Sequence, residues 1–208
     1  MTDESFNDPN RGMNILISIV SQIIKLNKDE ETLIRALFKV KKFNQGDYFL
    51  EEGKVCKEIG FITKGLVAYF IDSVELHVYD FCQENEFVSN YESFLNQSES
   101  SKSISCLEDT EMLCITFNDL QVLYKKISEG QKLGRIISEN LFLDAIEKLT
   151  SFYTESPEAK YERFLKKYPD LIQRIPQYYV ASFVNVKPQS LSRIRKRMLN
   201  KSKVNPGE

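Results

Sequence analysis

Basic, amide and hydroxyl side chains that suit contacts with an anionic polymer lie close together near the end of the chain. Arg193 has the geometry to bond a guanine through two hydrogen bonds, and Gln189 could do the same with an adenine. The residues around them can contact phosphates, which positions a protein without reading sequence. These flanking residues are Lys187, Ser190, Ser192, Arg195, Lys196 and Arg197. The chemistry available to this group is non-covalent recognition of double-stranded DNA.

Two short helical patterns joined by a tight turn would hold these side chains in place. Pro176 suits the first position of one helix, because a proline there needs no N–H group. Asn185 lies in the turn 184–186 and can adopt the left-handed conformation that ends a helix. Pro188 then begins a second helix, 188–199. This pattern predicts a helix-turn-helix, whose second helix enters the major groove.

The second helix has two different faces when its residues are placed at about 100° intervals. Its apolar face contains Leu191, Ile194 and Met198. Its polar face contains Gln189, Arg193, Lys196 and Asn200. A solvated basic helix at a chain end is the alternative interpretation. The turn and the apolar stripes together favour DNA binding.

The charge of the chain is unevenly distributed. Residues 171–208 carry eight basic side chains and one acid, a formal charge of +7. The preceding 170 residues carry 20 basic and 29 acidic side chains, a formal charge of −9, although the whole chain has only −2. An acidic body discourages nucleic acid from binding elsewhere, so we expect binding that is confined to the C-terminal face and sensitive to salt.

Length and composition limit the remaining function classes. A chain of 208 residues with 42% hydrophobic content can bury one good core and a smaller one. No apolar run reaches the roughly 18 residues expected of a membrane span. The beginning of the chain lacks the pattern of a signal sequence. We therefore expect a cytoplasmic protein with no membrane partner.

The sequence contains no group of residues typical of a metal centre or a catalytic site. Cys56, Cys82, Cys106 and Cys114 are widely scattered, so we expect reduced, largely buried thiols rather than disulfides or a metal site. His77 lies in an alternating segment and is more typical of an ordinary strand residue than of a ligand. We accordingly expect no enzyme activity, no metal and no resident cofactor.

The segments before the basic tail predict a mixed α and β architecture. Residues 15–26 and 28–38 have helical patterns, whereas residues 39–117 contain short strand-like runs separated by glycines and polar turns. Several strands at this spacing indicate an antiparallel sandwich or barrel. Residues 128–153 then return to a long helical pattern. We expect three parts, residues 1–127, 128–154 and 155–208.

The long helical pattern is apolar on more than one side. One apolar row contains Leu133, Ile137, Leu141, Ala145 and Leu149. Ile136, Leu143 and Ile146 lie off that row and are our candidate dimerisation residues. So wide an apolar surface indicates burial against the strand domain on one side and a partner helix on the other. A helix packed within a monomer is the alternative, but helix-turn-helix proteins commonly pair to read two half-sites.

Several motifs in this order resemble the Crp/Fnr family of bacterial transcription regulators. The motifs are FNQGDYF at 43–49 with EG at 52–53, FITKGLV at 61–67, LED at 107–109 and the tail 181–198. The resemblance covers nearly the whole chain. It implies an α+β fold with an N-terminal antiparallel β-roll sensor domain, a double-stranded β-helix of jelly-roll type. A long dimerisation helix and a C-terminal winged helix-turn-helix domain would follow. It also implies a homodimeric regulator that contacts RNA polymerase and responds to a small-molecule effector.

The family's nucleotide pocket is poorly matched. Members that bind cyclic AMP use a glycine-glutamate pair and then an arginine beside a small hydroxyl residue. Here Ser89 and Asn90 align with the pair and Ser100 with the arginine, while Lys102 and Glu86 are the nearby charged residues. A lysine cannot form the bidentate fork of an arginine. These five residues form our candidate ligand pocket, and we expect no cyclic AMP binding. The alternative function is a cyclic-nucleotide or other small-molecule sensor that acts through a protein partner.

Overall fold

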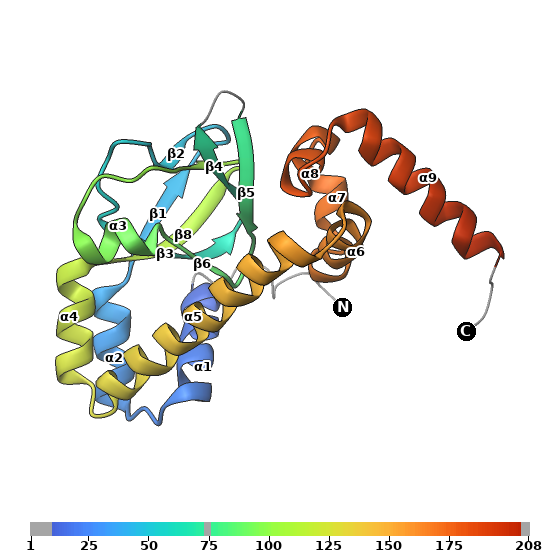
Figure 1. Ribbon diagram of the computed structural model, residues 1–208. Helices are drawn as coiled ribbons and strands as arrows, with labels where there is room; N and C mark the ends of the chain where they lie inside the picture. The colour runs from blue at the N-terminus through green and yellow to red at the C-terminus, as the bar shows by residue number, and fades with distance from the viewer. Residues whose placement is uncertain (1–9, 73–75, 205–208) are drawn as a thin grey trace, which may run out of the picture.

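A computed structural model describes residues 10–72 and 76–204, and its first half is an antiparallel β-roll made of two four-stranded sheets (Figure 1). The first sheet has the order β1 (Lys39–Phe43), β8 (Thr110–Thr116), β3 (Glu58–Lys64) and β6 (Phe87–Val88). The second has the order β2 (Tyr48–Leu50), β7 (Ser103–Cys106), β4 (Val67–Asp72) and β5 (Leu76–Cys82). The predicted β-roll is confirmed.

Glycine turns separate the strands, and the turn between β3 and β4 requires its glycine. Gly65 has a φ of 104°, a conformation that residues with a side chain rarely adopt. A Cβ atom at this position would lie 2.5 Å from Oγ1 of Thr110 and 2.7 Å from its Cα atom. The absence of a side chain therefore lets this turn pack against the start of β8.

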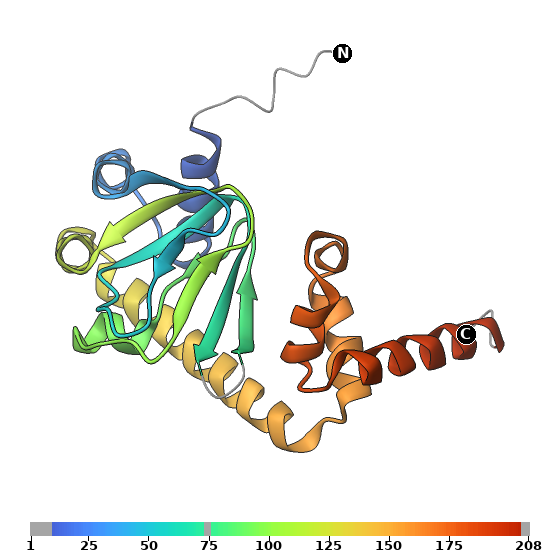
Figure 2. The ribbon, with the colours of Figure 1, turned by 90° about the horizontal axis from the view of Figure 1, so that it is seen from above.

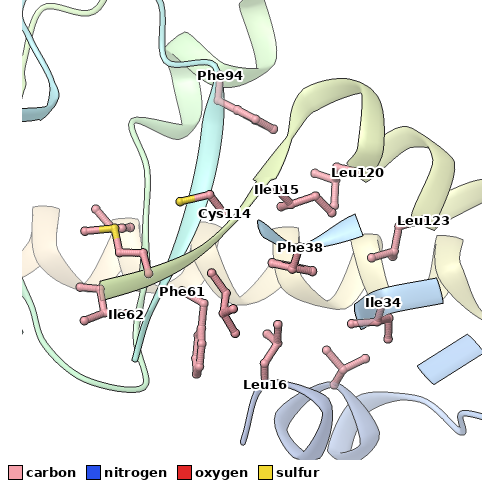
Figure 3. Packing of buried hydrophobic residues seen from close by; sticks show 14 of the residues in the cluster. Leu16, Ile34, Phe38, Phe61, Ile62, Phe94, Cys114, Ile115, Leu120 and Leu123 are labelled. Atoms are coloured by element: carbon pink, nitrogen blue, oxygen red, sulfur yellow. The ribbon is translucent and has the colours of Figure 1, made fainter. Parts of the chain in front are cut away.

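Helices α1 (Arg11–Ile23), α2 (Lys28–Leu37), α4 (Phe117–Lys126) and the start of α5 (Gly130–Thr154) pack beside the first sheet, and α3 (Tyr91–Asn96) follows β6. Apolar residues of these helices and of the sheet form the larger core, part of which Figure 3 shows. Leu16, Ile34, Phe61, Ile62 and Phe94 are fully buried there. This core fixes where α5 leaves the β-roll.

Helix α5 is buried mainly at its beginning, and Ser151 near its end is also buried. Leu133 is buried, but beyond residue 138 most side chains of the helix are exposed, because α5 extends away from the first sheet (Figure 1). Phe142 is 64% exposed, Leu143 63% and Ile146 45%. This run of exposed apolar side chains is the feature of the described chain that most clearly lacks a covering element.

The C-terminal region is helical throughout its described part. It contains α6 (Pro157–Lys167), α7 (Leu171–Arg174), α8 (Gln177–Phe183) and α9 (Pro188–Val204). No strand follows β8 in residues 117–204, so the predicted wing is wrong for this part of the chain. Only nine residues separate α6 from α8, and that segment contains Pro169, Pro176 and the short helix α7. This segment therefore contains a short helix and no strand.

The C-terminal region shares a second core with the β-roll. Phe81 on β5 packs edge-on against Phe164 and Tyr168 of the α6 segment, with ring centroids 6.0 and 6.4 Å apart. Phe183 of α8 is 5.7 Å from the same ring. Phe70 of β4 also belongs to this cluster. As Figure 2 shows, the C-terminal helices lie on the side of the second sheet, while α9 runs away from it.

Arg174 adds a polar contact between the same two regions. Its guanidinium donates two hydrogen bonds to Glu84, at 2.9 and 3.0 Å, and two to Glu108, at 3.0 and 2.7 Å. Burial alone would raise the pKa of Glu84, but the hydrogen bonds from Arg174 outweigh it and lower that pKa. Glu84 and Glu108 lie at turns of the β-roll, so this fork joins two turns to the end of α7.

Candidate nucleic-acid interface and ligand cavity

Helices α8 and α9 form the predicted helix-turn-helix. Asn185 has a φ of 59°, the left-handed conformation expected at the turn. The amide of Val186 donates to the carbonyl of Ala181 at 2.9 Å, and that of Asn185 to the carbonyl of Ser182 at 2.9 Å. Pro188 begins α9 as predicted. Helix α8 begins at Gln177, with Pro176 immediately before it.

The two faces of α9 differ in burial as predicted. Leu191 and Ile194 are buried in the second core, and Met198 packs against it. Gln189, Arg193 and Lys196 are exposed. Among the described residues no acid lies within ion-pair distance of Arg193 or Lys196. Both charges are therefore available to a partner.

The predicted phosphate contacts around Gln189 and Arg193 differ in how far they interact within the chain. The hydroxyl of Ser192 donates to the carbonyl of Pro188 at 3.2 Å, within the helix. Arg197 lies 3.5 Å from the carboxylate of Glu158 on α6. Ser190 and Arg195 are partly buried, whereas Lys187 is exposed. Of these five predicted phosphate contacts, Lys187 is the least engaged within the chain.

A groove of about 690 Å³ runs between the first turn of α6 and the side of α9 that contains Arg193. The residues lining it are Ser156, Pro157, Glu158, Val186, Ser190, Arg193, Ile194, Lys196, Arg197 and Asn200. Four predicted base or phosphate contacts thus line one concave surface: Ser190, Arg193, Lys196 and Arg197. Glu158 is the acidic residue in its wall, and it lies beside Arg197.

A second, smaller cavity of about 280 Å³ lies between the β-roll and α5. Three of the predicted pocket residues, Ser89, Asn90 and Lys102, line it. The β-roll and α3 also contribute Tyr69, Tyr79, Tyr91 and Glu92, and α5 contributes Leu141, Asp144, Ala145 and Lys148. The cavity is therefore shared by the sensor domain and the long helix.

Asn90 and Ser100 align with the carboxylate and the arginine of the family pattern. In this chain their side chains form a hydrogen bond with each other. The amide of Asn90 donates to the hydroxyl of Ser100 at 2.6 Å, and both residues are buried. That hydroxyl donates to the carbonyl of Lys102 at 2.7 Å and accepts from its amide at 3.1 Å. Asn90 also caps α3 by accepting from the amide of Ser93. These neutral groups are committed to one another rather than to a ligand.

The structure places Glu86 in the turn between β5 and β6, not among the cavity-lining residues. Its carboxylate accepts a hydrogen bond from the amide of Gln83 at 2.9 Å, and burial raises its pKa. Glu86 therefore does not line the cavity together with Ser89, Asn90 and Lys102, contrary to its place in the candidate pocket. Lys102 lies over the ring of Tyr79, 4.7 Å from its centroid.

Our reading of the sequence missed the contribution of α5 to the cavity. Its four lining residues, Leu141, Asp144, Ala145 and Lys148, are spaced by three or four residues and so lie on one face of the helix. Asp144 and Lys148 interrupt an otherwise apolar stripe. Two charged residues on a face that should be buried were the signal for a polar cavity.

The described residues contain no cluster of His, Cys, Asp and Glu that could hold a metal ion. His77 is exposed on β5, and Cys56, Cys106 and Cys114 are free and buried. Burial raises the pKa of Cys114 to about 12, which disfavours its reactive thiolate. No described helix is both long enough and apolar enough to cross a membrane.

The β-roll is similar in sequence to a known protein family. Residues 40–126 match the family model of the cyclic nucleotide-binding domain. This range contains all eight strands except the first residue of β1, and it includes α3 and α4. The β-roll is therefore a domain of the cyclic nucleotide-binding type. The sequence has no significant match among curated proteins.

Solved structures extend the comparison to most of the chain. The catabolite activator protein of Thermus thermophilus is 18% identical, with a TM-score of 0.54, and the match covers 86% of each chain. The regulator CLP of Xanthomonas campestris is 14% identical with a TM-score of 0.63, over 85% of this chain and 93% of that one. A Crp/Fnr-family protein from Eubacterium rectale is 12% identical with a TM-score of 0.62, over 85% of each chain. The predicted resemblance is confirmed, and at these identities it concerns the fold.

Proposed function

We propose that the chain is a homodimeric, DNA-binding transcription regulator of the Crp/Fnr type. The observation that carries this proposal is the geometry of α9. Arg193, Lys196 and Gln189 are exposed on the face opposite the buried Leu191 and Ile194. A helix held in this way by its helix-turn-helix partner can present N-terminal side chains to base edges. The formal charge of +7 in residues 171–208 supports the same function.

Structural relatives support this proposal, because they include a catabolite activator protein and a global regulator linked to virulence gene expression. The exposed apolar residues of α5 supply a surface for a second copy of the chain. Ile136, which is partly buried, and Leu143 and Ile146 remain the proposed dimerisation residues. We further propose that the chain contacts RNA polymerase and that it meets DNA and RNA polymerase in the cytoplasm.

Arg193→Ala should weaken binding to selected DNA by about 1–3 kcal/mol and relax the preference at one base position. Lys196→Ala should weaken binding more evenly across sequences and reduce its dependence on salt, because a phosphate contact carries no sequence information. Sequences selected from a random DNA pool, followed by gel retardation of each variant at several salt concentrations, would measure both effects.

Lys125→Ala is the matched control, because Lys125 is an exposed lysine on α4 and lies outside the C-terminal region. Its removal should leave DNA affinity unchanged. Equal losses for Lys125→Ala and Lys196→Ala would point to non-specific attraction. An Arg193→Ala variant with unaltered affinity and base preference would remove the basis for treating α9 as the recognition helix.

We expect calorimetry to detect no tight binding of cyclic AMP or cyclic GMP. The buried amide and hydroxyl of Asn90 and Ser100 bond to each other at 2.6 Å and offer neither a carboxylate for the ribose nor a guanidinium for the phosphate. Binding in the micromolar range would show that this pair opens to admit a nucleotide. It would favour the alternative class, a cyclic-nucleotide sensor, if DNA binding were also absent.

A further inference from the structure

An acidic side chain of α6 lies against the basic surface of α9. The carboxylate of Glu158 is 3.5 Å from the guanidinium of Arg197. Both residues line the groove between the two helices, and Glu158 is the acidic residue among those that line it. The sequence has no acid at positions 171–207, so this negative charge comes from outside the basic segment. The fold therefore brings an acid to a surface that is otherwise basic or neutral.

The packing of α6 holds Glu158 in place. Ser156 caps this helix by accepting a hydrogen bond from the amide of Ala159 at 3.2 Å. Tyr161 and Phe164 of the same helix are buried in the second core. The side chain of Glu158 is only 24% exposed, and a carboxylate in the first turn of a helix is stabilised by the helix dipole. The acid is therefore a fixed part of the groove wall.

The side chain of Arg197 is more exposed than that of Glu158. It is 62% exposed, and a long side chain at such a site keeps much of its rotamer freedom. Exposed ion pairs are weak, because water and salt screen them. A DNA phosphate can therefore replace the carboxylate as the partner of the guanidinium.

Arg197 lies on the same side of α9 as the predicted base contact Arg193. The two residues are four positions apart, about one helical turn, and both line the groove. In the described chain, Arg193 and Lys196 have no acid within ion-pair distance, whereas Arg197 has one. A duplex that reaches Arg193 would thus bring its phosphates near a guanidinium that is already paired.

We propose that Glu158 limits the affinity of the chain for DNA by competing with phosphate for Arg197. This inference rests on the proposed function. Phosphate contacts add affinity without reading bases, so the competition weakens binding to every duplex by the same factor. Glu158 thus sets the overall strength of binding, whereas Gln189 and Arg193 set the preference among sequences.

Glu158→Gln keeps the shape of the side chain but removes its charge. It should tighten binding to the selected duplex and to a random duplex by the same factor, about threefold or more at low salt. The slope of log affinity against log salt concentration should become steeper by about 0.9, the value for one further phosphate contact. Gel retardation of both duplexes at several salt concentrations measures these changes. An unchanged affinity, or a gain on the selected duplex alone, would contradict the proposal.

Glu162→Gln is the matched control, because Glu162 is an exposed acid one helical turn further along α6 and does not line the groove. It changes the net charge of the chain by the same amount as Glu158→Gln and should leave both affinities close to those of the parent chain. An equal gain from the two variants would show that net charge, not the release of Arg197, is responsible.

Arg197→Ala separates competition from direct repulsion between Glu158 and DNA. Competition requires the guanidinium, so Glu158→Gln should lose most of its effect when it is introduced into Arg197→Ala. Repulsion by the carboxylate alone would leave the full gain in that background and would overturn the proposal.

Side-chain NMR of the Arg197 guanidinium tests the exchange of partners directly. Its signal should differ between the free parent chain and free Glu158→Gln, and the two signals should converge when each protein binds the random duplex. Identical signals in the free proteins, or a parent signal that DNA leaves unmoved, would each rule the exchange out.

The role of Glu158 and the proposed function can fail separately. If the selected duplex binds and Arg193→Ala weakens that binding, but Glu158→Gln changes nothing, only the role of Glu158 is excluded. If neither duplex binds the parent chain or Glu158→Gln at low salt, both proposals are excluded.

Discussion

Phe81→Ala is expected to lower the free energy of unfolding by about 3–5 kcal/mol, the range for deleting a buried aromatic ring. Phe81 is 1% exposed and contacts Phe164, Tyr168 and Phe183 from the C-terminal region. The void left by the missing ring would lie in the second core, where the β-roll and the C-terminal region meet. Denaturant unfolding measures the loss of free energy. Hydrogen exchange of the α8 amides shows whether the contact between α8 and the β-roll is weakened.

Phe94→Ala is the matched control because Phe94 is equally buried but belongs to the larger core. There its ring centroid lies 5.5 Å from that of Phe117. It should cost a similar free energy while leaving α8 exchange close to that of the parent chain at low denaturant concentration. If Phe81→Ala left α8 as protected as Phe94→Ala does, the second core would not be what holds the C-terminal region against the β-roll.

Local sequence patterns predicted the elements well because each depends on nearby residues. The glycine at position 65 is required by backbone conformation and by the closeness of Thr110, and both effects act through a tight turn. The helix-turn-helix was predictable for the same reason. Asn185 ends one helix, Pro188 begins the next, and the spacing of Leu191 and Ile194 shows which face is buried.

Contacts between distant segments were not predictable from those patterns. Phe81 and Phe164 each look like ordinary core residues, and nothing in their local spacing shows that they share one core. The pair of Asp80 and Lys148 spans 68 positions in the sequence. The cavity was found only in part for this reason, since Ser89, Asn90 and Lys102 lie in the segment suggested by the family pattern whereas Lys148 does not.

The wing was predicted only from resemblance, and the residues themselves do not favour it. In the described residues 117–204 every regular element is a helix, and α9 continues from the turn through Val204. Arg174, at the end of α7, instead binds Glu84 and Glu108 of the β-roll. The segment between α6 and α8 is therefore a contact between the C-terminal region and the β-roll.

The double substitution Leu143→Asp, Ile146→Asp is expected to convert a dimer into a monomer. Both side chains are exposed in the single chain, so the change should cost little in the stability of one subunit. In a dimer joined along α5 it would bury carboxylates without partners, so we expect dimer dissociation to become at least about 100-fold more favourable, or roughly 3 kcal/mol. Sedimentation velocity over a range of protein concentrations measures the shift.

Leu95→Asp tests whether any exposed leucine would have the same effect, because Leu95 on α3 is 46% exposed, much like Ile146 at 45%. It should leave the mass of the assembly unchanged. The α5 variant should also lose most of its affinity for a two-half-site DNA while retaining weak binding to one half-site, because each recognition helix is unaltered but no longer linked to a second. A monomeric parent chain, or a dimer that survives both aspartates, would show that α5 does not join the subunits.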